Sequence, residues 1–425
     1  MDQTSQQATL SAAINQNSTR LIEILSELVS YETIAPPARN TKPLQNWIGD
    51  FLVQHGFEVE RIPFYQDDLL IDGTKSGSNQ NAHDLILNGH VDVAPVGNLE
   101  HWQTNPFELV QDDDQLIGRG TDDMKGAMAC FLYLVELLDQ EEINLPGTLK
   151  IQSVVGEELG EAGTKTLLAN GQRADFAIVG DNSDLELQGQ GGVITGWIIL
   201  KSPQTFHDGN RVKMVATGGG LEGANMIEKM MVVIKALNQL EHYWGVTKTY
   251  PGFVPGTNTI NPAYIEGGIH PAFVSNQCRL WITVHFYPNE RPETVTQEIE
   301  AAVRAACQAD PWLQKIEPQF EWGGDSMLVD QGEVFPALPL DPNHSAIQSL
   351  ARQHRAVFGN APKLSMSTSV SDCGWFDYYG MPAVNYGPGS IEVAHSDNES
   401  VSLNQLIDYC QVIGRFILDW CDTAR

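Results

Sequence analysis

Side chains that could bind a metal ion lie at two points between residues 85 and 138. His90 and Asp92 follow the short apolar segment 85–87, and Asp122 and Asp123 precede a long apolar segment. Because side chains alternate along a strand, His90 and Asp92 would point to the same side, as a metal ligand and its orienting carboxylate do. The two motifs could form one site. Each also has a structural explanation, as an ion pair or as caps of a helix N-terminus.

A third acidic motif follows another apolar segment, 149–155, which is typical of a buried strand. Glu157 and Glu158 stand at its end. Adjacent glutamates there are difficult to explain as solvated surface, although a buried, ion-paired glutamate is a structural alternative. Imidazole nitrogens and carboxylate oxygens are common ligands of zinc in proteins. The three motifs together indicate one metal-binding site.

Alternating helix and strand patterns place these motifs in one sheet. Amphipathic helical patterns cover residues 18–30 and 44–52, and strand patterns cover 85–87, 149–155 and 177–181. This alternation predicts an α/β fold with a mostly parallel sheet flanked by helices. Parallel sheets bind ligands outside the carboxyl ends of their strands, where His90, Glu157 and Asp181 fall.

The order of the predicted elements changes after residue 191. Strand, helix, strand, strand and helix are expected at 195–200, 224–240, 259–266, 279–287 and 295–307. This order predicts a smaller α+β domain, residues 192–323, inserted into a catalytic domain formed by 1–191 and 324–425. The catalytic domain resumes with a helix at 344–358, a strand at 383–386 and a helix at 403–420. The loop between the last two carries His395.

Composition excludes several classes of protein. The chain has 54 acidic and 25 basic residues, a net charge of −29, which argues against nucleic-acid binding because phosphates require a basic surface.

No apolar run reaches the roughly 18 residues of a membrane span. The first residues lack the pattern of a secretory signal, so we expect a cytoplasmic protein. The six cysteines contain no CxxC pair and are expected to be reduced, mostly buried thiols.

Three segments, in their order and spacing, carry a family resemblance. GHVDV at 89–93, GRGTDDMKG at 118–126 and GEE at 156–158 resemble the acetylornithine deacetylase and succinyl-diaminopimelate desuccinylase family of two-metal amidohydrolases. Aminoacylases, carnosinases and related carboxypeptidases belong to the same group. The resemblance extends from about Leu21 to the C-terminus. It implies a zinc-peptidase-like catalytic domain, an inserted lid or dimerisation domain, and a homodimer formed through that inserted domain.

The resemblance also implies a set of metal ligands for two divalent ions, most simply zinc, with cobalt or manganese as alternatives. Asp122 would then be a helix-capping residue. Asp123 would bridge the two ions, with His90 and Asp181 completing one site and Glu158 and His395 the other.

Further roles follow from the same resemblance. Asp92 would hold the His90 ring. Glu157, adjacent to a ligand but free of the ions, would act as general base towards an activated water and then as general acid. His207 would polarise the scissile carbonyl. His285 stands where many relatives have an arginine that binds a substrate carboxylate, and histidine is shorter and only partly charged near neutrality.

The expected function is hydrolysis of the amide bond of an N-acyl amino acid, a small-molecule substrate, as in the deacetylase and desuccinylase branch. A dipeptidase or aminoacylase of the same superfamily is an alternative. A rival of another class is a catalytically idle relative that acts as a binding module. The presence of all five candidate ligands together with Glu157 favours the enzyme.

Overall fold

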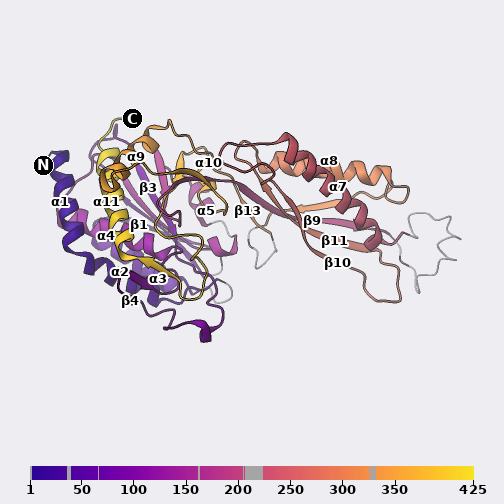
Figure 1. The fold of residues 1–425 in the computed structure, drawn as a ribbon, viewed down its shortest axis with the longest axis horizontal. Coiled ribbons are helices and arrows are strands. Elements are labelled where there is room, and N and C mark those ends of the chain that lie inside the picture. The colour runs from indigo at the N-terminus through magenta and orange to yellow at the C-terminus, as the bar shows by residue number, and fades with distance from the viewer. Residues whose placement is uncertain are drawn as a thin grey trace. The chain divides into compact units, whose positions relative to one another are not determined.

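The computed structural model describes residues 2–35, 40–65, 67–160, 163–203, 205, 224–324, 326 and 332–425. The chain divides into two compact units, Met1–Gln190 with Leu338–Arg425, and Gly191–Ala337 (Figure 1). Each unit has its own core of buried apolar side chains.

The larger unit contains a mixed eight-stranded sheet in the order β1-β2-β6-β3-β7-β15-β8-β14. Its neighbouring strands β6, β3, β7 and β15 are parallel, so their carboxyl ends lie at one edge. All six residues of β3 are buried, as expected of a strand covered on both faces. The strands are β1 (Glu58–Pro63), β2 (Leu69–Lys75), β3 (Leu85–His90), β6 (Leu149–Val154), β7 (Phe176–Val179), β8 (Leu187–Gln190), β14 (Leu364–Ser367) and β15 (Ala383–Asn385). A separate three-stranded sheet comprises β4 (Val110–Asp112), β5 (Gln115–Ile117) and β16 (Ser400–Ser402).

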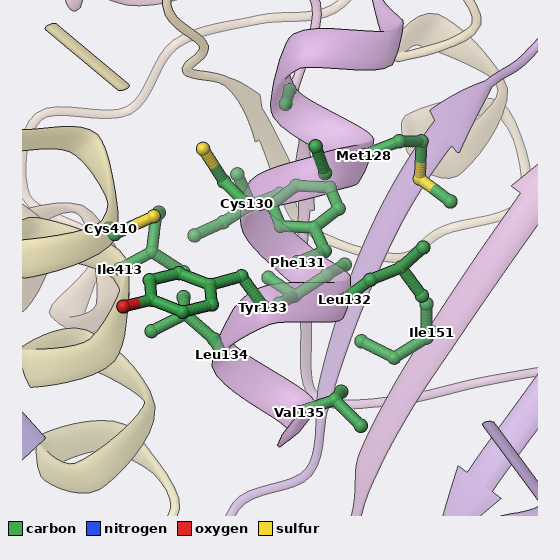
Figure 2. Close-up of a cluster of buried hydrophobic side chains, with 14 of the residues drawn as sticks. Met128, Cys130, Phe131, Leu132, Tyr133, Leu134, Val135, Ile151, Cys410 and Ile413 are labelled. Atoms are coloured by element: carbon green, nitrogen blue, oxygen red, sulfur yellow. The ribbon is translucent and has the colours of Figure 1, made fainter. Parts of the chain in front are cut away.

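Helix α4 (Lys125–Gln140) lies at the centre of the larger core. It packs against β3, α2 and α11, and every residue from Lys125 to Leu138 is buried. A helix that is apolar on all sides needs such complete coverage. Figure 2 shows Ile151 of β6 on one side of α4, and Cys410 and Ile413 of α11 on the other.

Among the other helices of this unit, α3 and α5 contact β2, whereas α1, α2 and α11 contact α4. The predicted helices at 18–30, 344–358 and 403–420 correspond to α2, α9 and α11. The segments are α1 (Gln3–Gln16), α2 (Ser18–Ser30), α3 (Lys42–Gln54), η1 (Leu99–His101), η2 (Glu157–Leu159), α5 (Gly163–Ala169), α9 (Ser345–Phe358), α10 (Gly374–Tyr378) and α11 (Leu403–Trp420). The expected α/β fold class is confirmed.

The smaller unit is an α+β unit with an antiparallel sheet in the order β10-β11-β9-β12, and β13 also pairs with β9. The sequence analysis places the return to the larger unit at residue 324, whereas the structure places it at Leu338. The difference arises because β13 still belongs to the smaller sheet. The elements are β9 (Gly192–Lys201), α7 (Met226–Thr247), β10 (Ile260–Gly267), β11 (Gln277–Phe286), α8 (Pro292–Ala309), β12 (Gln319–Trp322) and β13 (Val334–Phe335).

Two expectations from composition can be compared with the structure. All six cysteines are buried and free, as predicted. Among the helices of the described residues, none combines the length and apolarity that a membrane span requires.

Candidate metal centre

The candidate ligands come from the edge where the parallel strands end. His90 is the last residue of β3, and the loops after β6 and β7 carry the next acidic residues. Because these strands are neighbours, residues far apart in sequence meet at this edge. Two overlapping groups have ligand atoms within 4.8 Å of one another: His90, Asp123 and Asp181, and Asp123, Glu158 and His395.

Asp123 belongs to both groups and offers one oxygen to each histidine. Its Oδ1 lies 3.0 Å from Nε2 of His90, and its Oδ2 lies 3.1 Å from Nε2 of His395. The same Nε2 of His395 lies 3.0 Å from Oε2 of Glu158. The structure therefore brings together all five residues predicted as ligands, with Asp123 in the middle.

The electrostatics of this cluster favour bound cations. Burial, together with the nearby charge of Asp123, raises the pKa of Asp181 to about 7. Burial likewise raises the pKa of Glu158 to about 7, although a hydrogen bond with His395 partly opposes this rise. Carboxyl groups crowded in this way repel one another when ionised, and divalent cations remove that penalty. The nitrogen and oxygen donors, in two groups sharing one carboxylate, fit two divalent ions.

Asp92 contacts His90 mainly through its backbone. Nδ1 of His90 lies 3.0 Å from the carbonyl oxygen of Asp92 and 3.6 Å from its Oδ1, too far for a side-chain hydrogen bond. The other carboxylate oxygen accepts a hydrogen bond from the backbone N–H of Glu158 at 3.2 Å. The side chain of Asp92 therefore connects the loops after β3 and β6, and only its backbone carbonyl lies within hydrogen-bond distance of the His90 ring.

Glu157 lines a cavity beside the cluster, together with Asp123, Asp181 and His395. Burial raises the pKa of Glu157 well above that of an ordinary glutamate; His90 opposes the shift, and the surrounding carboxylates add to it. A carboxyl group with a raised pKa accepts a proton more readily than an ordinary glutamate does, which suits a group that must take a proton and later return it.

The predicted capping role of Asp122 is wrong. Helix α4 begins at Lys125, its N-cap position is Met124, and no side chain caps it. Oδ1 of Asp122 instead accepts a hydrogen bond from the backbone N–H of Ser390 at 2.8 Å. Asp122 thus anchors the loop that leads to His395. Burial, more than any neighbouring charge, raises its pKa to about 8.

A buried ion pair that the sequence analysis missed supports the cluster. Oε1 of Glu399 accepts hydrogen bonds from the backbone N–H groups of Gly120, Asp122 and Asp123 at 3.0, 2.8 and 3.0 Å. Its other oxygen pairs with Arg119, and both side chains are at most 1% exposed. Arg119 also donates to the backbone carbonyls of Pro95 and His395. The Arg119–Glu399 pair thereby joins the loops after β3, after β5 and before β16.

The two remaining predicted residues belong to the smaller unit. His285 is exposed on β11, where it pairs with Val193 of β9, and its Nδ1 lies 3.1 Å from Oγ1 of Thr259. His207 lies outside the described residues.

Known proteins share both the sequence and the fold. Residues 86–419 match peptidase family M20/M25/M40. The chain is 50% identical, over 98% of both chains, to N-formyl-4-amino-5-aminomethyl-2-methylpyrimidine deformylase of Bacillus subtilis (strain 168). It is 46% identical, over the same shares, to the protein of that name from Halalkalibacterium halodurans. Among solved structures, the di-peptidase Dug1p from Saccharomyces cerevisiae aligns with a TM-score of 0.69 at 15% identity, over 99% of both chains.

Proposed function

Because the chain belongs to peptidase family M20/M25/M40 and is a metal-dependent hydrolase of linear amides, we propose that it is a deformylase of an N-formyl aminomethylpyrimidine. The observation that carries this proposal is the 50% identity, over 98% of both chains, to the Bacillus subtilis enzyme. The relatives' names thus favour a formamide on a pyrimidine over the N-acyl amino acid expected from the motifs.

The proposed reaction adds water to the formamide and releases formate and a primary amine. His90, Asp123, Asp181, Glu158 and His395 would hold two divalent ions, which would supply Lewis-acid chemistry for the carbonyl group and for water. Glu157 removes a proton from the attacking water as the C–O bond forms. It then delivers that proton to the leaving nitrogen as the C–N bond breaks. The raised pKa of Glu157 supports this double role.

The lining of the cavity supports a neutral substrate. Besides the acidic cluster, it includes neutral polar side chains such as Asn182, Gln190, Ser371 and Asn385. Within the described part of the chain, none of the residues that line it is lysine or arginine. The described lining therefore offers a free α-carboxylate no lysine or arginine, whereas an uncharged aminopyrimidine can hydrogen-bond to its amides and hydroxyls. The presence of His285 in place of an arginine is consistent with this preference.

A substrate panel tests the proposal. Zinc-loaded protein would be assayed for release of formate from the formylated pyrimidine, and for release of amine from N-acetylornithine, N-succinyl-diaminopimelate and dipeptides. We expect kcat/KM to be highest for the formylated pyrimidine. Faster hydrolysis of an N-acyl amino acid or a dipeptide would favour the deacylase or dipeptidase alternatives instead. Zinc as the metal, a homodimer and a cytoplasmic location remain parts of this proposal.

A further inference from the structure

Asn385 presents an unused amide to the cavity beside the metal cluster. It is the last residue of β15, which lies beside β7, the strand that leads to Asp181. The residue is only 4% exposed, and it lines the same cavity as Glu157 and Asp123. Within the described part of the chain, its buried Oδ1 has no hydrogen-bond partner.

Such an acceptor destabilises the protein unless something pairs with it. A buried polar atom loses its hydrogen bonds to water and gains nothing in return unless it finds a partner. The neighbouring polar groups of the cavity already engage one another. Gln190 donates from Nε2 to the carbonyl oxygen of Ser371, and its Oε1 accepts from the N–H and hydroxyl of the same serine. The amide of Asn385 therefore remains available to a bound molecule.

We propose that Asn385 is a specificity-determining residue that binds the aminopyrimidine ring of the substrate through its 4-amino group and the adjacent ring nitrogen. This inference rests on the proposed function. The ring edge offers a donor next to an acceptor, and an asparagine amide offers the complementary acceptor and donor. The same pairing lets asparagine recognise the amino group and ring nitrogen of adenine. Oδ1 accepts from the 4-amino group, and Nδ2 donates to the ring nitrogen.

This pairing places the two ends of the substrate in different parts of one cavity. The ring is held at Asn385, and the formamide reaches Glu157 and the acidic cluster. A substrate without the 4-amino group leaves Oδ1 of Asn385 buried and unpaired, so the enzyme discriminates against it. One bidentate pair corresponds to a discrimination of about 10- to 100-fold in kcat/KM.

The test compares two substrates across three variants. One substrate is N-formyl-4-amino-5-aminomethyl-2-methylpyrimidine, and the other is the same formamide without the 4-amino group. The ratio of their kcat/KM values should be about 10 to 100 in the wild type. It should fall close to 1 in Asn385→Leu, mainly through loss of activity on the amino substrate. Asn385→Asp, which keeps the acceptor and the volume, should give an intermediate ratio.

Asn360 provides the control, because it is an exposed asparagine that does not line this cavity. Asn360→Ala should keep the wild-type ratio. Metal content and melting temperature would identify a misfolded variant, and the ratio measured with Asn385→Asp would then decide. An unchanged ratio in a folded Asn385 variant, or a ratio lost in Asn360→Ala, would overturn the inference and leave the proposed function intact. A wild type that does not hydrolyse the formylated pyrimidine would instead overturn the proposed function.

Discussion

Oε1 of Glu399 lies 3.0 Å from the backbone nitrogen of Asp123 and accepts its hydrogen bond. The bridging candidate is thus held through its main chain by a residue four positions after His395. The position of Asp123 relative to His395 therefore depends on this contact.

Replacing Glu399 should weaken metal binding and stability together. Glu399→Ala leaves Arg119 buried and unpaired, which typically costs about 3–5 kcal/mol. Loss of a supporting partner typically weakens metal affinity by about 10- to 100-fold. Chemical denaturation and titration with a zinc indicator would measure the two effects. Glu392→Ala, an exposed change in the same segment, is the control. Wild-type zinc affinity in a folded Glu399→Ala protein would contradict a positioning role.

Glu157→Gln should separate proton transfer from metal binding. Glutamine keeps the volume of the side chain but cannot accept the proton, so kcat should fall by at least the roughly 10²- to 10⁴-fold typical of a general base. Metal analysis should still find the wild-type metal content. Glu158→Gln is the matched comparison and should lose metal. A Glu157→Gln protein that lacked metal or retained near-normal turnover would show that the roles assigned to Glu157 and Glu158 are wrong.

Asp122 should make the stability of the metal-free protein depend on pH. Its folded pKa of about 8 lies above the ordinary value of 3.8, because burial disfavours the charge. The folded state therefore holds this proton more tightly, and stability falls as pH rises from about 4 to about 8. Asp122→Asn does not titrate, so its stability relative to the wild type should increase by roughly 1 kcal/mol per pH unit over that window. Denaturant titrations at several pH values would measure the free energy of unfolding of both proteins. If the difference between Asp122→Asn and the wild type stayed constant with pH, Asp122 would be ionised in the folded state.

His207 provides a test of the proposed homodimer. β10 is an edge strand of the smaller sheet, and Tyr264 on it is 57% exposed, which suits pairing with a second copy. If His207 acts in the partner's site, His207→Ala and Glu157→Gln chains should each be inactive alone. A mixture that exchanges subunits should regain activity, because each mixed dimer has one complete site. Exchange confirmed by mass spectrometry without regained activity would show that His207 does not act across the interface.

The sequence predicts those parts of the fold and site that follow from local patterns. His90 and the Glu157–Glu158 pair follow apolar segments, so the sequence predicts that they lie at the ends of strands. Asp123 was identified because the motif around it resembles a known family. Helix α1 was not predicted, because its sequence is mainly polar and its only buried residues are Leu10 and Ile14. These two lie against Gly414 of α11, which follows about 400 residues later.

The missed support of the site depends on contacts between distant segments. Glu399 reads as an ordinary loop glutamate until the fold brings it to three backbone N–H groups of the 120–123 turn. Arg119 lies inside a recognised motif and could have prompted a search for a buried carboxylate partner. Asp122 was misassigned for the same reason. An acidic residue before a helix is most often a cap, and only the approach of the Ser390 loop gives it another partner.

The discontinuous larger unit has a consequence for biosynthesis. His90 and Asp123 are translated early, whereas His395 and Glu399 belong to the segment that follows the inserted unit. At about 5–20 residues per second, the ribosome needs roughly 15 to 60 s to proceed from His90 to His395. Until the chain is almost finished, the carboxylates of the cluster therefore lack His395, their last candidate partner. We therefore expect the proposed pair of ions to bind late, and nascent chains that end before residue 395 not to hold both ions.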